Sequence, residues 1–549
     1  MAAPDDFSSY NSELLQGNYD CVDRIALRAY FRLGQTSGGF LTWWNRLFPG
    51  KAPTQQYLRR MAGDFARRVK AFSQKHSIAL QYCQIGERNK YEKAEKARPK
   101  DPNFQGVFLI LVAKAPAPVW QIKNSRRGKL LIRPAKGWPL VNHYHFHILD
   151  KHWGHISIRM SGHPPFGAQI LLNGHEWLER QARKEAICYS KEGNCFVGGS
   201  DLAALNHLAV GLEGSSGLIQ LAKVCDRWIY SACLCFGLTR AEQQRSDFRY
   251  AYSSYQLEYS RNLLFKSGPK LDQVYQGLID RTRNLLDVAR LKTIFGRRHR
   301  PHQYRGKCQR LEKILERSVH DLTVFKLHFG RLTLKMYDKG ERVLRIELIV
   351  NNTAELQCGK GIEKLPIILA RSQQMIVEFL GVVQAAHLSF LPAEQLDTLA
   401  MPTYRGQQRL AGVDIQKPRL RVVAQALIAL APQPDGFTAE QLAARVRRQQ
   451  GRTMARYNTR KAAYDLRKFR GKALVQRIAK TRRYRVRRPG IRTLAALLIL
   501  REQVLKPVLA GVCRPKRGRP PKNVHPLDLH YQALQRQMLS TLQYLKLAA

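Results

Sequence analysis

Acidic residues are scarce in this chain, and their scarcity is its first physical constraint. The 549 residues include 41 Asp and Glu against 92 Lys and Arg, which gives a formal net charge of +51. No acidic residue occurs from Pro102 through Leu149. A surface this positive repels itself unless it meets a polyanion, so nucleic acid is the first partner to consider and an anionic membrane the second.

Three further absences narrow the class of protein. The most apolar run, GVFLILVA at 106–113, is too short to cross a bilayer and is typical of a buried strand. The N-terminus has neither a basic region nor an apolar segment, so we expect no signal peptide and no membrane partner. The ten cysteines form no CxxC pair, which favours reduced thiols in a cytoplasmic protein, associated with the nucleoid if bacterial.

The hydrophobic patterns predict a multidomain α+β chain. We expect a helical N-terminal region at 1–100, a mixed helical and antiparallel-sheet body at 101–390 that holds the candidate active site, a linker at 391–415, a DNA-binding domain at 416–510 and a tail with a terminal helix at 511–549. Within the body, Thr239-Arg-Ala-Glu242 fits a capping box and predicts a helix from about 240 to 266.

The region after Arg419 reads as three helices followed by two short strands, ALVQRI (473–478) and RRYRV (482–486). Basic residues mark the third helix and the hairpin: Arg456, Arg460, Lys461, Arg467, Arg482 and Arg483. This order resembles a winged helix-turn-helix domain, which implies a third helix in the major groove and a wing on the phosphate backbone. The alternative is a basic three-helix domain that binds a protein.

A basic segment without acidic residues, CRPKRGRPPKNVHP, spans 513–526. Its core PKRGRPP resembles an AT-hook, which implies that Arg517 and Arg519 enter the narrow, negative minor groove of A·T-rich DNA. Gly518 would let the backbone approach the groove floor, and Pro520 would keep the chain extended. The alternative is a solvated basic linker.

Histidines concentrate in NHYHFHILDKHWGHISIRM (142–160), where alternation places His143, His145 and His147 on one strand face. The run His145-Phe146-His147 resembles the core of HUH endonucleases. That resemblance implies that the two imidazoles hold a divalent metal, Mg or Mn, against a scissile phosphate. The alternative is a basic β-region whose histidines lie against nucleic acid.

Tyrosines recur in FRYAYSSYQLEYSRNLLF (248–265). Inside the expected helix, Tyr252, Tyr255 and Tyr259 share a face at i, i+3 and i+7. The YxxxY spacing resembles two-tyrosine HUH enzymes, which implies that Tyr259, beside Glu258, attacks DNA and forms a phosphotyrosine. The alternative is a stripe of aromatic core residues.

The segment LTLKMYDKGERVLRIELIVNN (332–352) alternates on both sides of a turn. With an odd number of loop residues, Lys335, Tyr337, Arg345 and Glu347 fall on one face of a hairpin. Glu347 is then suited to holding a metal, while Lys335 and Arg345 are suited to neutralising a phosphate. The segment resembles the YDK…LR-E region of plasmid and filamentous-phage replication initiators, which nick DNA.

Together these patterns lead to the hypothesis of a DNA-nicking, strand-transferring protein of a mobile element. The expected site residues are catalytic Tyr259, Glu258, Lys335 and Arg345, with His145, His147 and Glu347 around the metal. Two alternatives stay open: a non-enzymatic DNA-binding regulator or architectural protein, and an RNA-binding processing factor.

Overall fold

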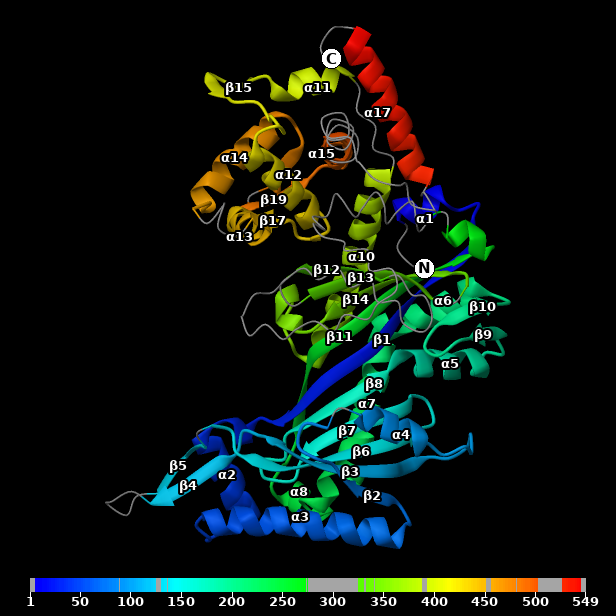
Figure 1. The fold of residues 1–549 in the computed structure, drawn as a ribbon. Coiled ribbons are helices and arrows are strands. Elements are labelled where there is room, and N and C mark those ends of the chain that lie inside the picture. Colours follow the sequence, from blue (N-terminus) through cyan, green and yellow to red (C-terminus); the bar gives the residue numbers. More distant parts are fainter. Residues whose placement is uncertain are drawn as a thin grey trace, which may run out of the picture. The chain divides into compact units, whose positions relative to one another are not determined.

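The structure of the protein, a computed structural model, describes residues 5–87, 89–124, 130–135, 137–272, 274, 324–329, 332–339, 341–387, 393–450, 456–479, 481–501 and 526–544. The chain divides into two compact units (Figure 1). Unit 1 comprises the described residues of Leu15–Lys266 and Leu315–Gln373. Unit 2 comprises those of Ala3–Leu14, Ser267–Ile314 and Gln374–Ala549. Helices and a mixed sheet occur together, which confirms the α+β expectation.

A ten-stranded sheet is the frame of unit 1, in the order β12-β13-β14-β11-β1-β8-β7-β6-β3-β2. Neighbouring strands are antiparallel except β2 and β3, which are parallel. In that order the strands are Val324–Phe329, Leu332–Lys339, Val343–Val350, Tyr250–Phe265, Leu15–Phe31, Ala168–Asn173, Gly154–Ser161, Leu140–Asp150, Gly106–Pro116 and Ala79–Tyr82. Eight of these ten strands lie within 101–390, where an antiparallel sheet was expected.

The first 100 residues are not uniformly helical, because β1 (Leu15–Phe31) lies near the middle of the sheet. It pairs with β11 along most of its length and with β8 from Arg24 to Ala29. Both partners lie more than a hundred residues away in sequence, and long-range pairing of this kind overrides local helix preference. Trp43 and Trp44 do lie on a helix, α2 (Ser37–Leu47), and both indoles are fully buried.

The helix expected from 240 to 266 is wrong beyond its first turns. The capping box of Thr239 and Glu242 is present, but the helix it opens, α8, covers only Arg240–Arg245. Asp247 takes a left-handed conformation with φ of 47°, which ends the helix. The chain then enters the long strand β11, so the three tyrosines lie on a strand and not on a helix.

Helices pack on one face of the sheet along most of its width. Phe65 of α3 (Gln55–Lys75) packs on Tyr144 of β6 with ring centroids 4.7 Å apart. Asp226 of α7 (Ser215–Ala232) accepts a hydrogen bond of 2.6 Å from Tyr252 of β11. Tyr144 and Tyr252 belong to the same sheet face, so α3 and α7 both cover that face.

On the opposite face, the described elements cover two separate regions of the sheet. Near β3 and β6 it is covered by α4 (Lys90–Lys96), whose Ala94 packs with Leu109 and Leu111. Near β1, β11 and β14 it is covered by the start of α5 (Gly174–Lys184) and by the turn between β9 (Tyr189–Lys191) and β10 (Phe196–Gly199). The remaining elements of unit 1 include α6 (Leu202–Val210) and the pair β4 (Trp120–Asn124) and β5 (Leu130–Pro134).

Unit 2 contains the expected three helices and hairpin. The helices are α12 (Pro418–Leu430), α13 (Ala439–Gln450) and α14 (Thr459–Gly471). The strands β18 (Val475–Arg477) and β19 (Arg483–Val486) form the hairpin, and β17 (Phe437–Thr438) adds a third strand beside β19. The other elements include α1 (Asp6–Tyr10), α11 (Ala393–Ala400), β15 (Thr403–Arg405), β16 (Gln408–Leu410), α15 (Arg488–Ile499) and α17 (Pro526–Tyr544).

Among the described residues, one helical stretch, Ile362–Ala385, is long and apolar enough to cross a membrane, with a mean hydropathy of 1.2. It consists mainly of α10 (Leu365–His387), whose apolar side chains are mostly buried in the protein. Core helices of water-soluble domains pass the same test, so this is weak evidence for a span.

Candidate functional site

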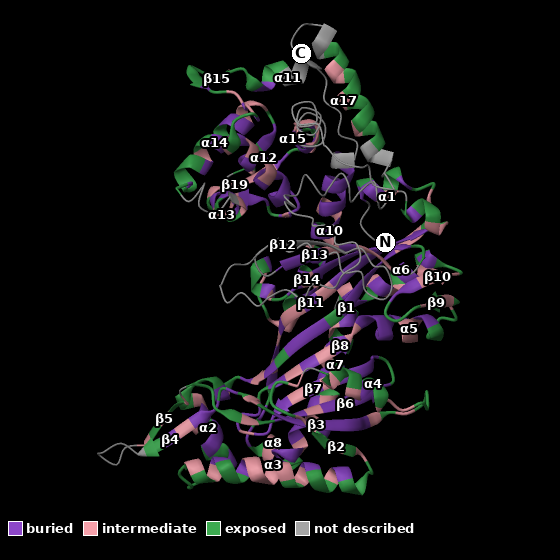
Figure 2. Cartoon of the chain, viewed as in Figure 1, coloured by how far each residue is buried: buried purple, intermediate pink, exposed green. Residues whose placement is uncertain are grey.

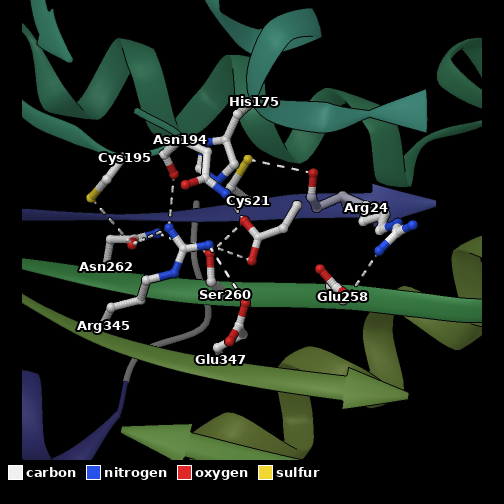
Figure 3. A network of polar contacts seen from close by, with 12 residues as sticks. Cys21, Arg24, His175, Asn194, Cys195, Glu258, Ser260, Asn262, Arg345 and Glu347 are labelled. Atoms are coloured by element: carbon white, nitrogen blue, oxygen red, sulfur yellow. Dashed lines mark hydrogen bonds and ion pairs between the residues drawn. The ribbon is translucent and has the colours of Figure 1, made fainter. Parts of the chain in front are cut away.

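A network of buried polar side chains lies on one face of the sheet, where β1, β11 and β14 run side by side (Figure 3). Its buried members are Cys21 and Asp23 of β1, Ser260 and Asn262 of β11, Arg345 and Glu347 of β14, His175 of α5, and Cys195 before β10. The exposed residue Asn194 joins the network through its backbone carbonyl. Strands from the two ends of unit 1's sequence therefore bring chemically active groups together in a water-poor site.

Arg345 is the centre of this network and is 0% exposed. Its guanidinium forms an ion pair of 2.7 Å with Asp23 and donates a hydrogen bond of 2.9 Å to the backbone carbonyl of Asn194. Glu347 is 3.9 Å away. A buried guanidinium needs such partners because the loss of hydration is costly.

Asp23 is bound on several sides. Beside Arg345, it accepts a hydrogen bond of 2.8 Å from the Ser260 hydroxyl and contacts His175 Nε2 at 2.5 Å. Burial alone would raise the pKa of Asp23, but Arg345 and His175 together lower it to about 2. Burial lowers the pKa of His175 more than Asp23 raises it, so its neutral form is favoured. The carboxylate is therefore charged at neutral pH.

The predicted hairpin face is present. Lys335 lies directly opposite Glu347, and Tyr337 lies directly opposite Arg345. The ammonium of Lys335 donates a hydrogen bond of 3.0 Å to Glu347. Each cation of this face is thus neutralised by a carboxylate of the protein, which leaves little positive charge for a phosphate.

Glu258 lies at the edge of the network on β11. It is half-buried and forms an ion pair of 3.7 Å with Arg24 of β1. Burial raises the pKa of Glu258, and Glu347 adds to this increase while Arg24 opposes it. The structure therefore brings Glu258 near Glu347, as expected for the candidate site.

Tyr259 lies on the other face of β11 and is 1% exposed. Its hydroxyl donates to Glu213 at 2.9 Å and contacts Asp20 at 3.3 Å. Asp20 is in turn held by both Nε and an Nη of Arg261 at 2.7 Å. Burial first, and then the two carboxylates, raise the pKa of Tyr259 well above its ordinary value. The phenol is thus protonated, enclosed and directed away from Glu258 and Glu347.

The three expected metal ligands do not meet. His145 and His147 lie on β6, and Glu347 lies on β14, five strands away in the same sheet. At about 4.8 Å between strands, this separation is about 24 Å, far beyond the reach of one ion. The predicted grouping was wrong because four strands lie between the two motifs: β7, β8 and β11 from the intervening sequence, and β1 from the N-terminal region.

His147 has a different partner, His155 on the neighbouring strand β7. The two rings are joined by a contact of 3.0 Å between Nδ1 and Nε2, and His155 also lies 3.6 Å from Glu95. Burial lowers the pKa of His147 to about 3. His147 pairs with Ser157 and Leu149 pairs with His155, so the two histidines are diagonal neighbours on one face of the hairpin.

Among the residues that the structure describes, one other group has the composition of a metal site. Ligand atoms of Cys21, Asp23 and His175 lie within 4.8 Å of one another, and all three residues are buried. The set does not fit Mg or Mn, which prefer several oxygen ligands, because it offers one carboxylate, a thiol and an imidazole. Asp23 is also already occupied by Arg345. Sequence reasoning missed this group because His175 is 152 residues from Asp23.

The basic residues predicted to bind DNA in unit 2 lie at the surface. Arg456, Arg460, Lys461 and Arg467 are exposed around α14, and Arg482 is exposed in the hairpin. Arg483 is different, because it is half-buried and its guanidinium donates to the backbone carbonyl of Gly436. The AT-hook residues Arg517, Gly518, Arg519 and Pro520 lie outside the described residues.

Comparison of the chain with protein-family models, with curated proteins and with solved structures found no match. Function must therefore be inferred from the geometry.

Proposed function

We propose that this is a non-enzymatic duplex-DNA-binding protein in which α12–α14 and the β18–β19 hairpin act as a winged helix-turn-helix domain. The order of elements supports the proposal: helix, short strand, two helices, then two strands, with the three strands in one sheet. In domains of this kind the third helix enters the major groove and the hairpin contacts phosphates.

The two faces of α14 are the observation that carries the proposal. Ala462, Leu466 and Phe469 are fully buried, so this side packs against the domain core. Arg460, Lys461 and Arg467 on the other side are exposed, and Tyr464 is 46% exposed between them. An aromatic ring among free cations is typical of a nucleic-acid interface.

Charge balance supports the same conclusion. Residues 419–488 contain three acidic side chains, Asp435, Glu440 and Asp465. Asp465 is fully buried and bound internally by Arg419 and Tyr457. Lys468 of α14 also pairs with Asp465, at 3.7 Å, but the exposed cations Arg460, Lys461 and Arg467 do not pair with it, and a phosphate backbone is their matching partner.

The proposal is tested with Arg460→Ala/Lys461→Ala and a labelled duplex. The variant should bind more weakly, and the slope of log K against log salt should become shallower by about 1.8, since each lost phosphate contact removes about 0.9. Arg492→Ala/Arg536→Ala is the matched control, because it removes two exposed charges elsewhere in unit 2. Equal losses in both variants would place the interface elsewhere.

The nicking hypothesis has less support from this geometry. Tyr259 is enclosed, and His145 and His147 lie far from Glu347 in the sheet. A covalent protein–DNA adduct formed by the full chain with Mg or Mn would restore that hypothesis and overturn the non-enzymatic reading.

A further inference from the structure

A row of polar side chains crosses five strands of unit 1. His145, Arg159, Gln169, Arg28 and Ser253 lie directly opposite one another on β6, β7, β8, β1 and β11. Directly opposed residues of antiparallel strands point to the same side, so all five lie on one sheet face. This is the face that α3 and α7 leave uncovered.

The row is accessible to solvent across its whole width. Arg28 is exposed, and the other four residues are partly exposed. Figure 2 shows such intermediate residues among the buried ones of β7 and β8. The alternate residues are the buried core: Phe146, Ile158, Ile170 and Leu27. The face is therefore an open polar platform. We use the name open strip for the five residues of the row together with Arg24, Tyr255, Gln256 and Glu258.

The open strip carries positive charge that the protein does not neutralise. It contains three arginines and one acidic residue, Glu258, which pairs with Arg24. Arg28 and Arg159 form no ion pair in the part of the chain that the structure describes, and Arg159 Nε is buried without a hydrogen-bond partner. An unsatisfied guanidinium nitrogen favours the arrival of an acceptor.

Tyr255 adds an aromatic surface to this charge. It is the extra residue of a β-bulge, since Ala26 pairs with Gln256 and Leu27 pairs with Ser254. The guanidinium of Arg28 lies 4.8 Å from the centre of its ring. A bulge turns a side chain out of the regular alternation, and here it places the ring beside the arginine.

We propose that the open strip binds single-stranded nucleic acid, with Arg28 and Arg159 on phosphates and Tyr255 as a stacking surface for a base. Five strands at about 4.8 Å give a platform about 19 Å wide, which cannot enter a major groove about 12 Å wide. Duplex bases are stacked on one another, so only an unpaired base can stack on Tyr255. This site is in unit 1 and is separate from the duplex site proposed in unit 2, although it rests on the same view of the chain as a nucleic-acid-binding protein.

The test compares oligo-dT, oligo-U and a duplex in fluorescence anisotropy with the full chain. Arg28→Ala/Arg159→Ala should weaken the binding of one or both single strands at least tenfold. For the affected strand, the slope of log K against log salt should become shallower by about 1.4, at 0.7 for each phosphate contact. The two arms show whether DNA or RNA is preferred. Arg59→Ala/Arg60→Ala is the matched control, because these exposed residues lie on α3, which covers the other sheet face.

Tyr255 separates stacking from charge. Tyr255→Phe should keep single-strand affinity, while Tyr255→Ala should reduce it by about five- to a hundredfold. Equal single-strand affinity in the Arg28/Arg159 variant and its control would overturn the proposal, as would tight binding of poly-Glu but no oligonucleotide. If the duplex proposal alone fails, changing Arg460 and Lys461 will leave duplex affinity unchanged. Single-strand binding will then still depend on Arg28.

Discussion

Asp23 offers the sharpest test of the buried network. Asp23→Asn keeps the shape of the side chain but removes the negative charge that forms an ion pair of 2.7 Å with Arg345. Removing one partner of a buried ion pair costs about 3–5 kcal/mol, because the other charge stays buried. We expect the lower end, about 3 kcal/mol, since Glu347 and the carbonyl of Asn194 remain near the guanidinium.

The pH dependence of this loss follows from the pKa of Asp23, which falls from an ordinary 3.8 to about 2 in the folded protein. A lowered carboxyl pKa stabilises the fold above the unfolded pKa, and the stabilisation is lost as the pH falls toward the folded value. The difference between wild type and Asp23→Asn should therefore be constant from pH 7 to pH 5 and should shrink only below about pH 4.

Tryptophan fluorescence in urea is the suitable assay because it reports unit 1 alone. All seven tryptophans lie there: Trp43, Trp44, Trp120, Trp138, Trp153, Trp177 and Trp228. Asp64→Asn is the matched control; Asp64 pairs with Arg67 at the surface, and such a pair contributes about 0–1 kcal/mol. Adding Arg345→Met to Asp23→Asn should recover part of the loss. An Asp23→Asn protein as stable as the control would refute the reasoning.

Two further predictions concern buried side chains of unit 1. Tyr259→Phe should lower stability by about 1–3 kcal/mol and leave DNA binding intact, because Glu213 loses its hydrogen-bond donor; a stable variant that has lost strand attachment would instead support the nucleophile hypothesis. Between pH 6.5 and pH 4.5, the free energy of unfolding should fall with decreasing pH less steeply in His147→Asn than in wild type, by about 1.4 kcal/mol per pH unit. The reason is that burial lowers the pKa of His147 to about 3, so its stabilisation is complete above the unfolded value of about 6.5 and is lost as the pH falls. Parallel pH curves in urea titrations would contradict that origin.

The sequence predicted local pairing well where alternation and turn length were both visible. The Lys335–Glu347 hairpin has its expected face, because a three-residue connection between Lys339 and Val343 keeps the two alternating patterns in register. Contacts between neighbouring strands of one hairpin follow from short-range patterns.

The spacing of the tyrosines misled for a specific physical reason. The bulge at Tyr255 inserts one residue into the alternation of β11, so that the buried residues Tyr252 and Tyr259 are seven apart, as on a helix. A seven-residue spacing is two turns of a helix, but it is also a strand with one extra residue. The partners of Asp23 could not be foreseen, since they depend on which strands become neighbours.

The position of β1 has a consequence for synthesis of the chain. Leu15 pairs with Phe265, so the first long strand leaves the ribosome about 250 residues before its main partner. At 5–20 residues per second, this interval is on the order of 10–50 s. During that time a 17-residue strand, rich in buried side chains, lacks β11. We therefore expect this segment to depend on chaperones, and nascent chains arrested before residue 250 to aggregate more readily than chains arrested after 350.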